Sequence, residues 1–379
     1  MHPLNTARSL KIYGRRLRPI LLVAGLTFLS LACRLSDVAI TPAGTAVSPT
    51  SSNTGASSSS TPDPSQAALP GSSRAHPIAR GQTAVAGQFT LTVLDSLRGD
   101  AAWQEIHLAN ANNTPPPEGM EYLLVNLRVS NTSNSPDEGY LGLHVTGDGR
   151  VVRFSFDSGV VPPAPALDSE LVGGDESSGW AAYLIREGEG NLMLVVEDYA
   201  NYDTPATYLA IDEDAALTVD RQTMLNYTPT DLGVERAQPV PFGQTATAED
   251  WQVIVDDVIT GPKAWDIVLE ANQFNDPPPD GLMYVLVNAR VRYIGLADGE
   301  HNISDSAFTL LANSGAELDS PSVVSPEPEL YFDLYAGGEA AGWIVLQAPE
   351  DAKNLVLYFN PAYDRSGANG RYLSLGQGR

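Results

Sequence analysis

The segment YLLVNLRV, residues 122–129, returns almost unchanged as YVLVNARV at residues 284–291. In the first copy the apolar residues Leu123, Val125, Leu127 and Val129 are two positions apart, so they would line one face of an extended chain. Alternation with a period of two over this length predicts a half-buried β-strand in each copy.

Working outward from this segment reveals a tandem duplication. Residues 81–129 and 243–291 align without a gap, with 23 of 49 positions identical. Further along, the pair Gly173-Gly174 recurs as Gly337-Gly338, and Gly179-Trp180 recurs as Gly342-Trp343. Each copy has about 130 residues, which is enough for a hydrophobic core of its own.

Each copy is predicted to be all-β. About seven short alternating segments are separated by turn signals, such as Gly147-Asp148-Gly149 between residues 141–145 and 151–154. Residues 180–185 and 192–196 predict two more strands, and no segment shows a long helical stripe. We therefore expect two tandem immunoglobulin-like β-sandwiches, with Trp180 and Trp343 as candidate core anchors.

Three elements resemble a known family. They are the strand at 122–131, the turn and strand GGEAAGWIV at 337–345, and the segment APEDAKNLVL at 348–357. The chain resembles the DUF4352, telokin-like immunoglobulin-type domain of bacterial surface lipoproteins over residues 85–211 and 247–375. The first copy departs from the third element with EGNL at 189–192. The resemblance implies a fold and a location but no reaction.

The N-terminus has the pattern of a bacterial lipoprotein signal. Five basic residues and no acids precede an apolar run from Ile20 to Ala32, which is too short to span a bilayer comfortably. The run ends in LSLAC, so that Cys33, the single cysteine of the chain, occupies the position that is lipidated in a lipobox. The alternative is an ordinary signal peptide with an incidental cysteine. The lipobox predicts a protein anchored in the cell membrane and facing the extracytoplasmic side.

Composition supports a tethered, acidic protein. Of the 35 residues at 41–75, 29 are Ser, Thr, Pro, Ala or Gly. Such a segment cannot bury enough apolar surface to offset the conformational entropy that it would lose on ordering. The predicted organisation is a signal peptide at 1–32, a disordered tether at 33–80, sandwiches at 81–213 and 241–379, and a linker at 214–240. Removal of the five basic residues leaves 17 basic against 46 acidic residues, a net charge of −29. Such acidity argues against nucleic-acid binding.

No catalytic or cofactor motif is present in the sequence. It contains no Gly-x-Ser-x-Gly, His-Glu-x-x-His, P-loop or dinucleotide-binding fingerprint. His107, His144 and His301 have no histidine counterpart in the other copy. Acidic loops could hold calcium, but a solvated acidic surface is the simpler interpretation. We expect no enzyme activity, no cofactor and no metal site.

Candidate binding residues come from the repeated loops. The PPPEG loop at 115–119 returns as PPPDG at 277–281, preceded twelve residues earlier by Trp103 and Trp265. The loop could recognise a ligand or form a strand crossover, and the tryptophans could stack on a sugar or pack in the core. The pairs Tyr202-Asp203 and Tyr363-Asp364 suggest a polar-aromatic rim for a glycan or peptide, or alternatively a tyrosine corner or surface filler.

Together these features predict a non-catalytic, lipid-anchored surface protein. Its expected partners are the membrane, through the lipid, and a surface protein, peptide or glycan. A glycan-binding surface module is the first alternative, and a metal-dependent hydrolase is the second.

Overall fold

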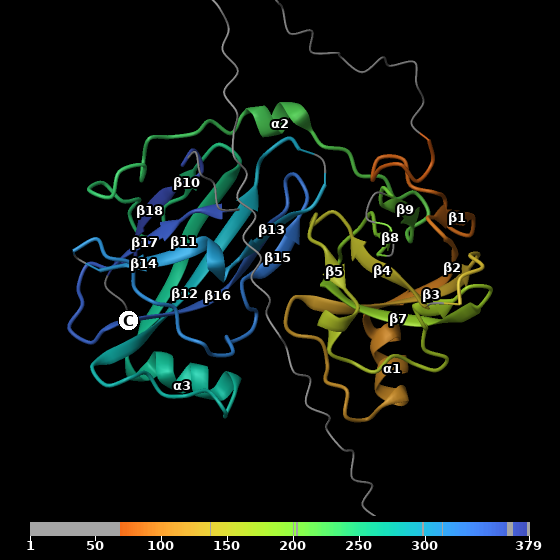
Figure 1. Ribbon diagram of the computed structural model, residues 1–379, viewed down its shortest axis with the longest axis horizontal. Coiled ribbons are helices and arrows are strands. Elements are labelled where there is room, and N and C mark those ends of the chain that lie inside the picture. Colours follow the sequence, from red (N-terminus) through yellow and green to blue (C-terminus); the bar gives the residue numbers. More distant parts are fainter. Residues whose placement is uncertain are drawn as a thin grey trace, which may run out of the picture. The chain divides into compact units, whose positions relative to one another are not determined.

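The structure is a computed structural model. It describes residues 69–136, 138–199, 201, 204–297, 299–312, 314–361 and 367–376. The predicted signal peptide, Cys33 and most of the tether lie outside the described residues. The described chain is built mainly of antiparallel strands, which confirms the all-β prediction (Figure 1).

The first repeat contains two sheets. One sheet has the strand order β1-β2-β3-β7, and the other has β5-β4-β8-β9, with β6 paired to β4. The predicted hairpin at Gly147 is present, because β4 pairs antiparallel with β5. The strands are β1 Thr83–Ala86, β2 Phe89–Arg98, β3 Met120–Asn131, β4 Glu138–Thr146, β5 Arg153–Phe154, β6 Glu170–Val172, β7 Glu176–Arg186, β8 Met193–Asp198 and β9 Thr207–Ala210.

The second repeat reproduces this order. Its sheet β10-β11-β12-β16 matches β1-β2-β3-β7, while β14-β17-β18 and the pair β13-β15 form the opposite layer. The strands are β10 Ala246–Thr247, β11 Trp251–Thr260, β12 Leu282–Tyr293, β13 His301–Ser304, β14 Phe308–Leu311, β15 Tyr331–Leu334, β16 Glu339–Pro349, β17 Val356–Phe359 and β18 Arg371–Ser374. Short 3-10 turns lie at Phe156–Ser158 and Asp305–Ala307.

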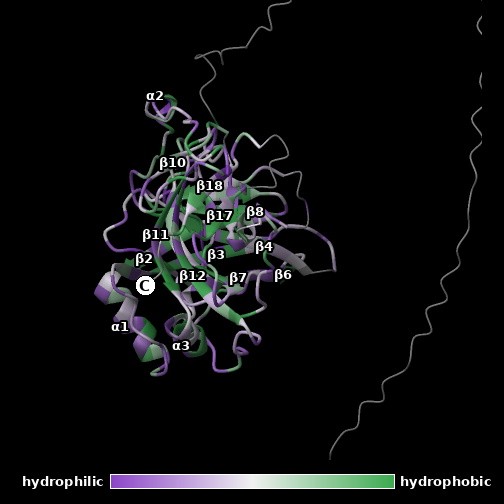
Figure 2. Cartoon of the chain, turned by 90° about the vertical axis from the view of Figure 1, so that its left-hand side faces the viewer, coloured by the Kyte–Doolittle hydropathy of each residue, from purple (hydrophilic) through white to green (hydrophobic). Residues whose placement is uncertain are grey.

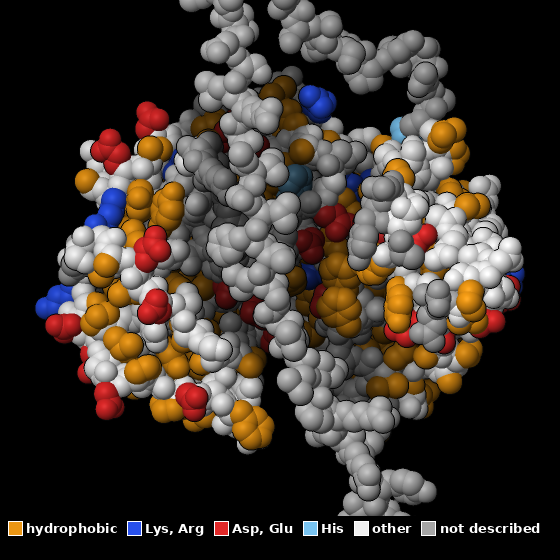
Figure 3. All heavy atoms as spheres, in the orientation of Figure 1, with side chains coloured by type: hydrophobic (Ala, Val, Ile, Leu, Met, Phe, Trp, Pro, Cys, Tyr) orange, Lys and Arg blue, Asp and Glu red, His pale blue; other side chains and the backbone are white. Residues whose placement is uncertain are grey.

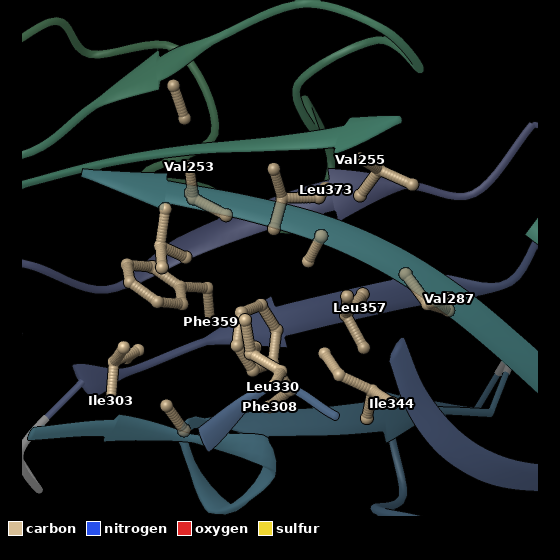
Figure 4. Packing of buried hydrophobic residues seen from close by; sticks show 14 of the residues in the cluster. Val253, Val255, Val287, Ile303, Phe308, Leu330, Ile344, Leu357, Phe359 and Leu373 are labelled. Atoms are coloured by element: carbon tan, nitrogen blue, oxygen red, sulfur yellow. The ribbon is translucent and has the colours of Figure 1, made fainter. Parts of the chain in front are cut away.

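The core of each repeat lies between its two sheets. In the second repeat, Val253 and Val287 of the first sheet face Leu357, Phe359 and other buried residues of the second (Figure 4). The alternating positions of β3 and β12 that face this layer are at most 1% exposed, as their period of two predicts. Each repeat is therefore a two-layer sandwich with its own hydrophobic cluster.

Two helices were not expected from the sequence. Helix α1, Gly99–Ala109, and helix α3, Pro262–Ala271, each lie on the outer face of the first sheet of their repeat. Each buries only two residues fully, and α1 is coloured partly as hydrophilic and partly as hydrophobic in Figure 2. The apolar stripe is too narrow and too short to stand out as a helical period in the sequence.

The helices also correct the role given to two tryptophans. Trp180 and Trp343 are half-buried and pack against the small clusters beneath α1 and α3. They lie outside the main core clusters because their strand positions point to the helix-covered face. They do not anchor the space between the sheets.

The segments flanking the first repeat are partly ordered. Residues 69–80, which the sequence assigns to the tether, pack onto the first repeat through a parallel bridge between Ile78 and Leu209. In the linker, Ala215 and Leu217 are buried against β8 and β9. Asp220 then caps the short helix α2, Arg221–Leu225, by accepting the backbone N–H of two residues in its first turn.

The hairpin of the first repeat pairs with the second repeat. Val151 forms an antiparallel bridge with Leu334, and the side chain of Val151 joins the core cluster of the second repeat. The backbone N–H of Tyr335 donates to the Arg150 carbonyl oxygen at 2.9 Å. A Cβ on Gly338 would lie 2.5 Å from that oxygen, so only glycine allows this approach. The two repeats therefore dock through backbone pairing as well as side chains.

Candidate functional site

The structure describes two of the six candidate binding residues named from the repeated motifs. Trp103 lies on α1, half-buried and stacked on Tyr122 with ring centroids 6.0 Å apart. Trp265 lies on α3 at the same distance from Tyr284. Both rings contribute to the helix–sheet contact of their repeat. The pairs Tyr202-Asp203 and Tyr363-Asp364 lie outside the described residues.

The repeated proline loop connects each helix to the following strand, and it is fixed by an asparagine. In the second repeat the Asn275 side-chain amide donates to the carbonyl oxygens of Val268 and Val324, at 2.8 and 2.9 Å. Its oxygen accepts the backbone N–H of Val324 at 2.8 Å. Asn113 makes the same three hydrogen bonds in the first repeat. This arrangement favours the crossover interpretation of the loop.

A cavity of about 560 Å³ lies in the second repeat, near the start of β11 and the end of β17. Its volume falls within the range of roughly 300–1,000 Å³ that is typical of small-molecule sites. The lining is mixed, with aromatic rings, two carboxylates, three amides and two serines. The residues are Asp250, Trp251, Tyr293, Glu300, His301, Asn302, Ile303, Ser304, Ser306, Ala307, Asn360, Pro361 and Asn369.

Stacked aromatic rings form one wall of this cavity. The imidazole of His301 stacks on Tyr293 with ring centroids 3.7 Å apart, and Trp251 meets Tyr293 edge-on at 5.1 Å. Burial and the charge of Asp250 raise the pKa of Tyr293 to about 12, despite a backbone hydrogen bond from Ala297. Burial also lowers the pKa of His301, against a hydrogen bond with the backbone of Ala297 and the charge of Asp250. Both rings are therefore neutral near pH 7.

Two buried polar atoms in the cavity wall are unpaired among the described residues. They are Nε2 of His301 and Oδ1 of Asn360. A buried polar atom without a partner costs about 1–3 kcal/mol, so such atoms are uncommon and often mark a site that a ligand or water completes.

One carboxylate of the cavity also belongs to the contact between the repeats. Oε1 of Glu300 lies 2.6 Å from Nε2 of the buried His144 and accepts a hydrogen bond from the Tyr335 hydroxyl, also at 2.6 Å. The guanidinium of Arg74 lies over the Tyr335 ring, 3.8 Å from its centroid. Burial alone would raise the pKa of Glu300, but His144, Tyr335 and Arg74 outweigh it and lower that pKa. Glu300 is therefore ionised at neutral pH.

The equivalent place in the first repeat is filled. Phe89 and Asn131 hold the paired positions that Trp251 and Tyr293 hold in the second repeat. There Gly139 of β4 lies so close that a Cβ would meet Phe89 at 2.8 Å and Asn131 Nδ2 at 3.0 Å. The polar cavity is therefore a specialisation of the second repeat, and the sequence indicated it only through the unrepeated His301.

A second, smaller cavity of about 380 Å³ lies in the first repeat and is mainly apolar. Phe154, Phe156 and Trp180 line it, together with Tyr199 at the rim.

Charge and membrane features complete the description. In Figure 3 the acidic side chains are spread over the face in view, and basic ones are few. Among the described residues, no group of three or more His, Cys, Asp or Glu is placed to hold a metal ion. The helices of the described chain include none that is long and apolar enough to cross a membrane.

Comparisons with known proteins give only distant structural similarities. No protein-family model and no curated protein matches the chain, so the DUF4352 resemblance stays a prediction. The ycdA protein of Bacillus subtilis, a candidate lipoprotein, is 15% identical with a TM-score of 0.28. That match covers 35% of this chain, and the chain spans only 38% of that protein. The yjhA protein of Bacillus subtilis is 13% identical with a TM-score of 0.25, over 36% of this chain and 98% of that one. An uncharacterized β-sandwich protein from Clostridium difficile is 12% identical with a TM-score of 0.23, over 36% and 94%. These scores are too low to carry a functional argument.

Proposed function

We propose that this chain is a lipid-anchored, extracytoplasmic binding protein without enzyme activity, and that the cavity of the second repeat is its ligand site. The observation that supports the site most strongly is the pair of unpartnered atoms, His301 Nε2 and Asn360 Oδ1, in a cavity of ligand size. The equivalent place in the first repeat is filled by side chains. This supports the interpretation that the cavity is a specific feature of the second repeat and not a general property of the sandwich.

The anchoring part of the proposal rests on the signal and on Cys33. The test is expression of the full chain and of a Cys33→Ser variant in a bacterial host, followed by membrane fractionation and mass spectrometry of the N-terminal peptide. The proposal expects a diacylglyceryl mass on Cys33 and release of the variant from the membrane fraction. Unmodified Cys33, with wild-type protein free in the medium, would reject anchoring.

The binding part is tested by blocking the cavity. Ser306 is exposed and lines the cavity, so Ser306→Phe would place a ring at its entrance, whereas Ser322→Phe adds the same ring at an exposed position outside it. Saturation-transfer NMR with amines, N-acetylglucosamine and short peptides should detect a ligand that binds wild type and Ser322→Phe but not Ser306→Phe. Equal binding to all three proteins would place the site elsewhere.

A glycan-binding module is the alternative that the aromatic wall favours. Sugar sites commonly combine a ring with planar polar side chains, and His301, Asp250 and Asn360 supply both. A glycan array with wild type and Ser306→Phe separates the alternatives. Binding that Ser306→Phe abolishes would favour the glycan.

A further inference from the structure

Several donors of the cavity in the second repeat are already hydrogen-bonded. Among the described residues, the amide donor of Asn302 is bonded to Asp333 at 3.0 Å, and that of Asn369 to Asp250 at 3.3 Å. The hydroxyls of Ser304 and Ser306 pair with each other at 2.7 Å. Each of these amides keeps a second N–H donor, and the serine pair uses one of its two hydroxyl protons.

Both buried polar atoms of the described wall that lack a partner are acceptors. Asn360 Oδ1 has no partner among the described residues, and an amide oxygen can only accept. The imidazole of His301 donates the hydrogen bond that it makes with the backbone of Ala297, because this bond favours the protonated ring. In the neutral tautomer, the unpaired Nε2 is then also an acceptor.

The charges of the cavity have one sign. Asp250 and Glu300 line it, and no Lys or Arg does so among the described lining residues. Arg74, which is not among the lining residues, interacts favourably with the charge of Glu300. Asp250 has no Lys or Arg beside it in the described lining.

We propose that this cavity binds a primary alkylammonium group, such as the side chain of a lysine in a peptide. An ammonium has three donors, no acceptor and a positive charge, which matches the two unpaired acceptors and the two carboxylates of the described wall. A sugar hydroxyl carries no charge, so it gains less from the carboxylates. The aromatic wall of Trp251, Tyr293 and His301 suits the alkyl stem. This inference rests on the proposed binding function and names the ligand class.

Isothermal titration calorimetry of the full chain tests the inference with defined probes. Nα-acetyl-lysine amide carries the ammonium, whereas its Nε-acetylated form is a neutral match. The first should bind, and the second should bind at least about tenfold more weakly, because a charge-assisted hydrogen bond is lost. N-acetylglucosamine and Ca²⁺ should give no comparable heat.

Variants test whether the lysine probe binds in the cavity. Asp250→Asn keeps the shape and removes a charge, so affinity for the lysine probe should fall about tenfold. Asn360→Asp converts an unpaired acceptor to a carboxylate and should tighten binding by roughly three- to tenfold, a gain that misfolding cannot mimic. Glu270→Gln makes the same loss of charge at an exposed position on α3 and should change nothing.

Two outcomes would overturn the ammonium assignment. One is equal binding of the lysine probe and its acetylated form, and the other is no response to Asp250→Asn and Asn360→Asp. If N-acetylglucosamine or Ca²⁺ binds in place of the amine and Ser306→Phe abolishes that binding, the cavity is still a ligand site with another ligand. If no probe binds in a way that depends on Ser306, both the ligand class and the proposed site fail.

Discussion

Replacing His144 tests whether its contact with Glu300 stabilises the docking of the two repeats. His144 is fully buried and lies 2.6 Å from a carboxylate whose side chain is 25% exposed. Breaking a fully buried pair by removing one partner costs about 3–5 kcal/mol, because the remaining charge is left uncompensated. Glu300 stays partly exposed to solvent and keeps its hydrogen bond from Tyr335. We therefore expect His144→Leu to lower the free energy of unfolding by about 2–3 kcal/mol.

The assay is urea unfolding of the full chain, followed by tryptophan fluorescence. Wild type should unfold in one transition because the repeats are docked, whereas His144→Leu should separate the two repeats into two transitions. Adding Glu300→Gln to His144→Leu should recover about 1–2 kcal/mol, because the buried charge is then removed as well.

An exposed ion pair provides the matched control. Arg290 and Asp256 are 2.8 Å apart, but their side chains are 42% and 32% exposed. Asp256→Asn should therefore cost at most about 1 kcal/mol. If His144→Leu costs no more than Asp256→Asn and unfolding stays a single transition, the buried pair does not hold the repeats together.

Three further predictions follow from the same contacts. Asn275→Ala should lower unfolding free energy by about 2–3 kcal/mol in thermal denaturation, because three hydrogen bonds of the crossover loop are lost, while the exposed Asn112→Ala should have no effect. Gly338→Ala should cost about 1–3 kcal/mol and weaken docking, because its Cβ would meet the Arg150 carbonyl oxygen; unchanged hydrogen exchange at the paired amides would contradict this. The lowered pKa of Glu300 stabilises the fold above the unfolded value of about 4.3, and this stabilisation should be lost as pH falls through the lower folded value. Burial raises the pKa of Asp333, so its contribution to stability changes with pH in the opposite direction. The contribution of Glu300 is therefore measured as the difference in unfolding free energy between wild type and Glu300→Gln at pH 7 and at pH 3. An equal pH dependence of the two proteins would contradict the prediction.

The sequence predicted the sandwich layers well because strand burial has a simple period. The core-facing positions, such as Leu123 and Val285, recur every second residue, and the duplication doubles the signal. Neighbouring positions such as Leu124 are buried as well, because a helix covers the other face. The hairpin at Gly147 was recognised from its turn residues alone. Helices α1 and α3 were missed because each is only three turns long and buries few residues.

The cavity and the docking contact could not be predicted from the periodicity of the sequence. The cavity wall collects side chains from positions 250, 293, 300–306, 360 and 369, which become neighbours only after the sheets form. Docking depends on the backbone near Arg150 meeting that near Tyr335, and the only sequence trace of this is a glycine pair shared by both repeats. In the first repeat Gly174, the match of Gly338, has no atom near an added Cβ, whereas Gly173 approaches the carbonyl oxygen of Ser133. The same glycine pair therefore makes different contacts in the two repeats.

The indole of Trp251 shows whether the cavity of the second repeat is the ligand site. Trp251 lines the cavity, is 4% exposed and is one of five tryptophans in the chain. In fluorine NMR of 5-fluorotryptophan-labelled protein, Trp251→Phe assigns its resonance. Nα-acetyl-lysine amide should shift this resonance and leave the other four unchanged. A Trp251 resonance that does not move when calorimetry shows the protein to be saturated would contradict this prediction.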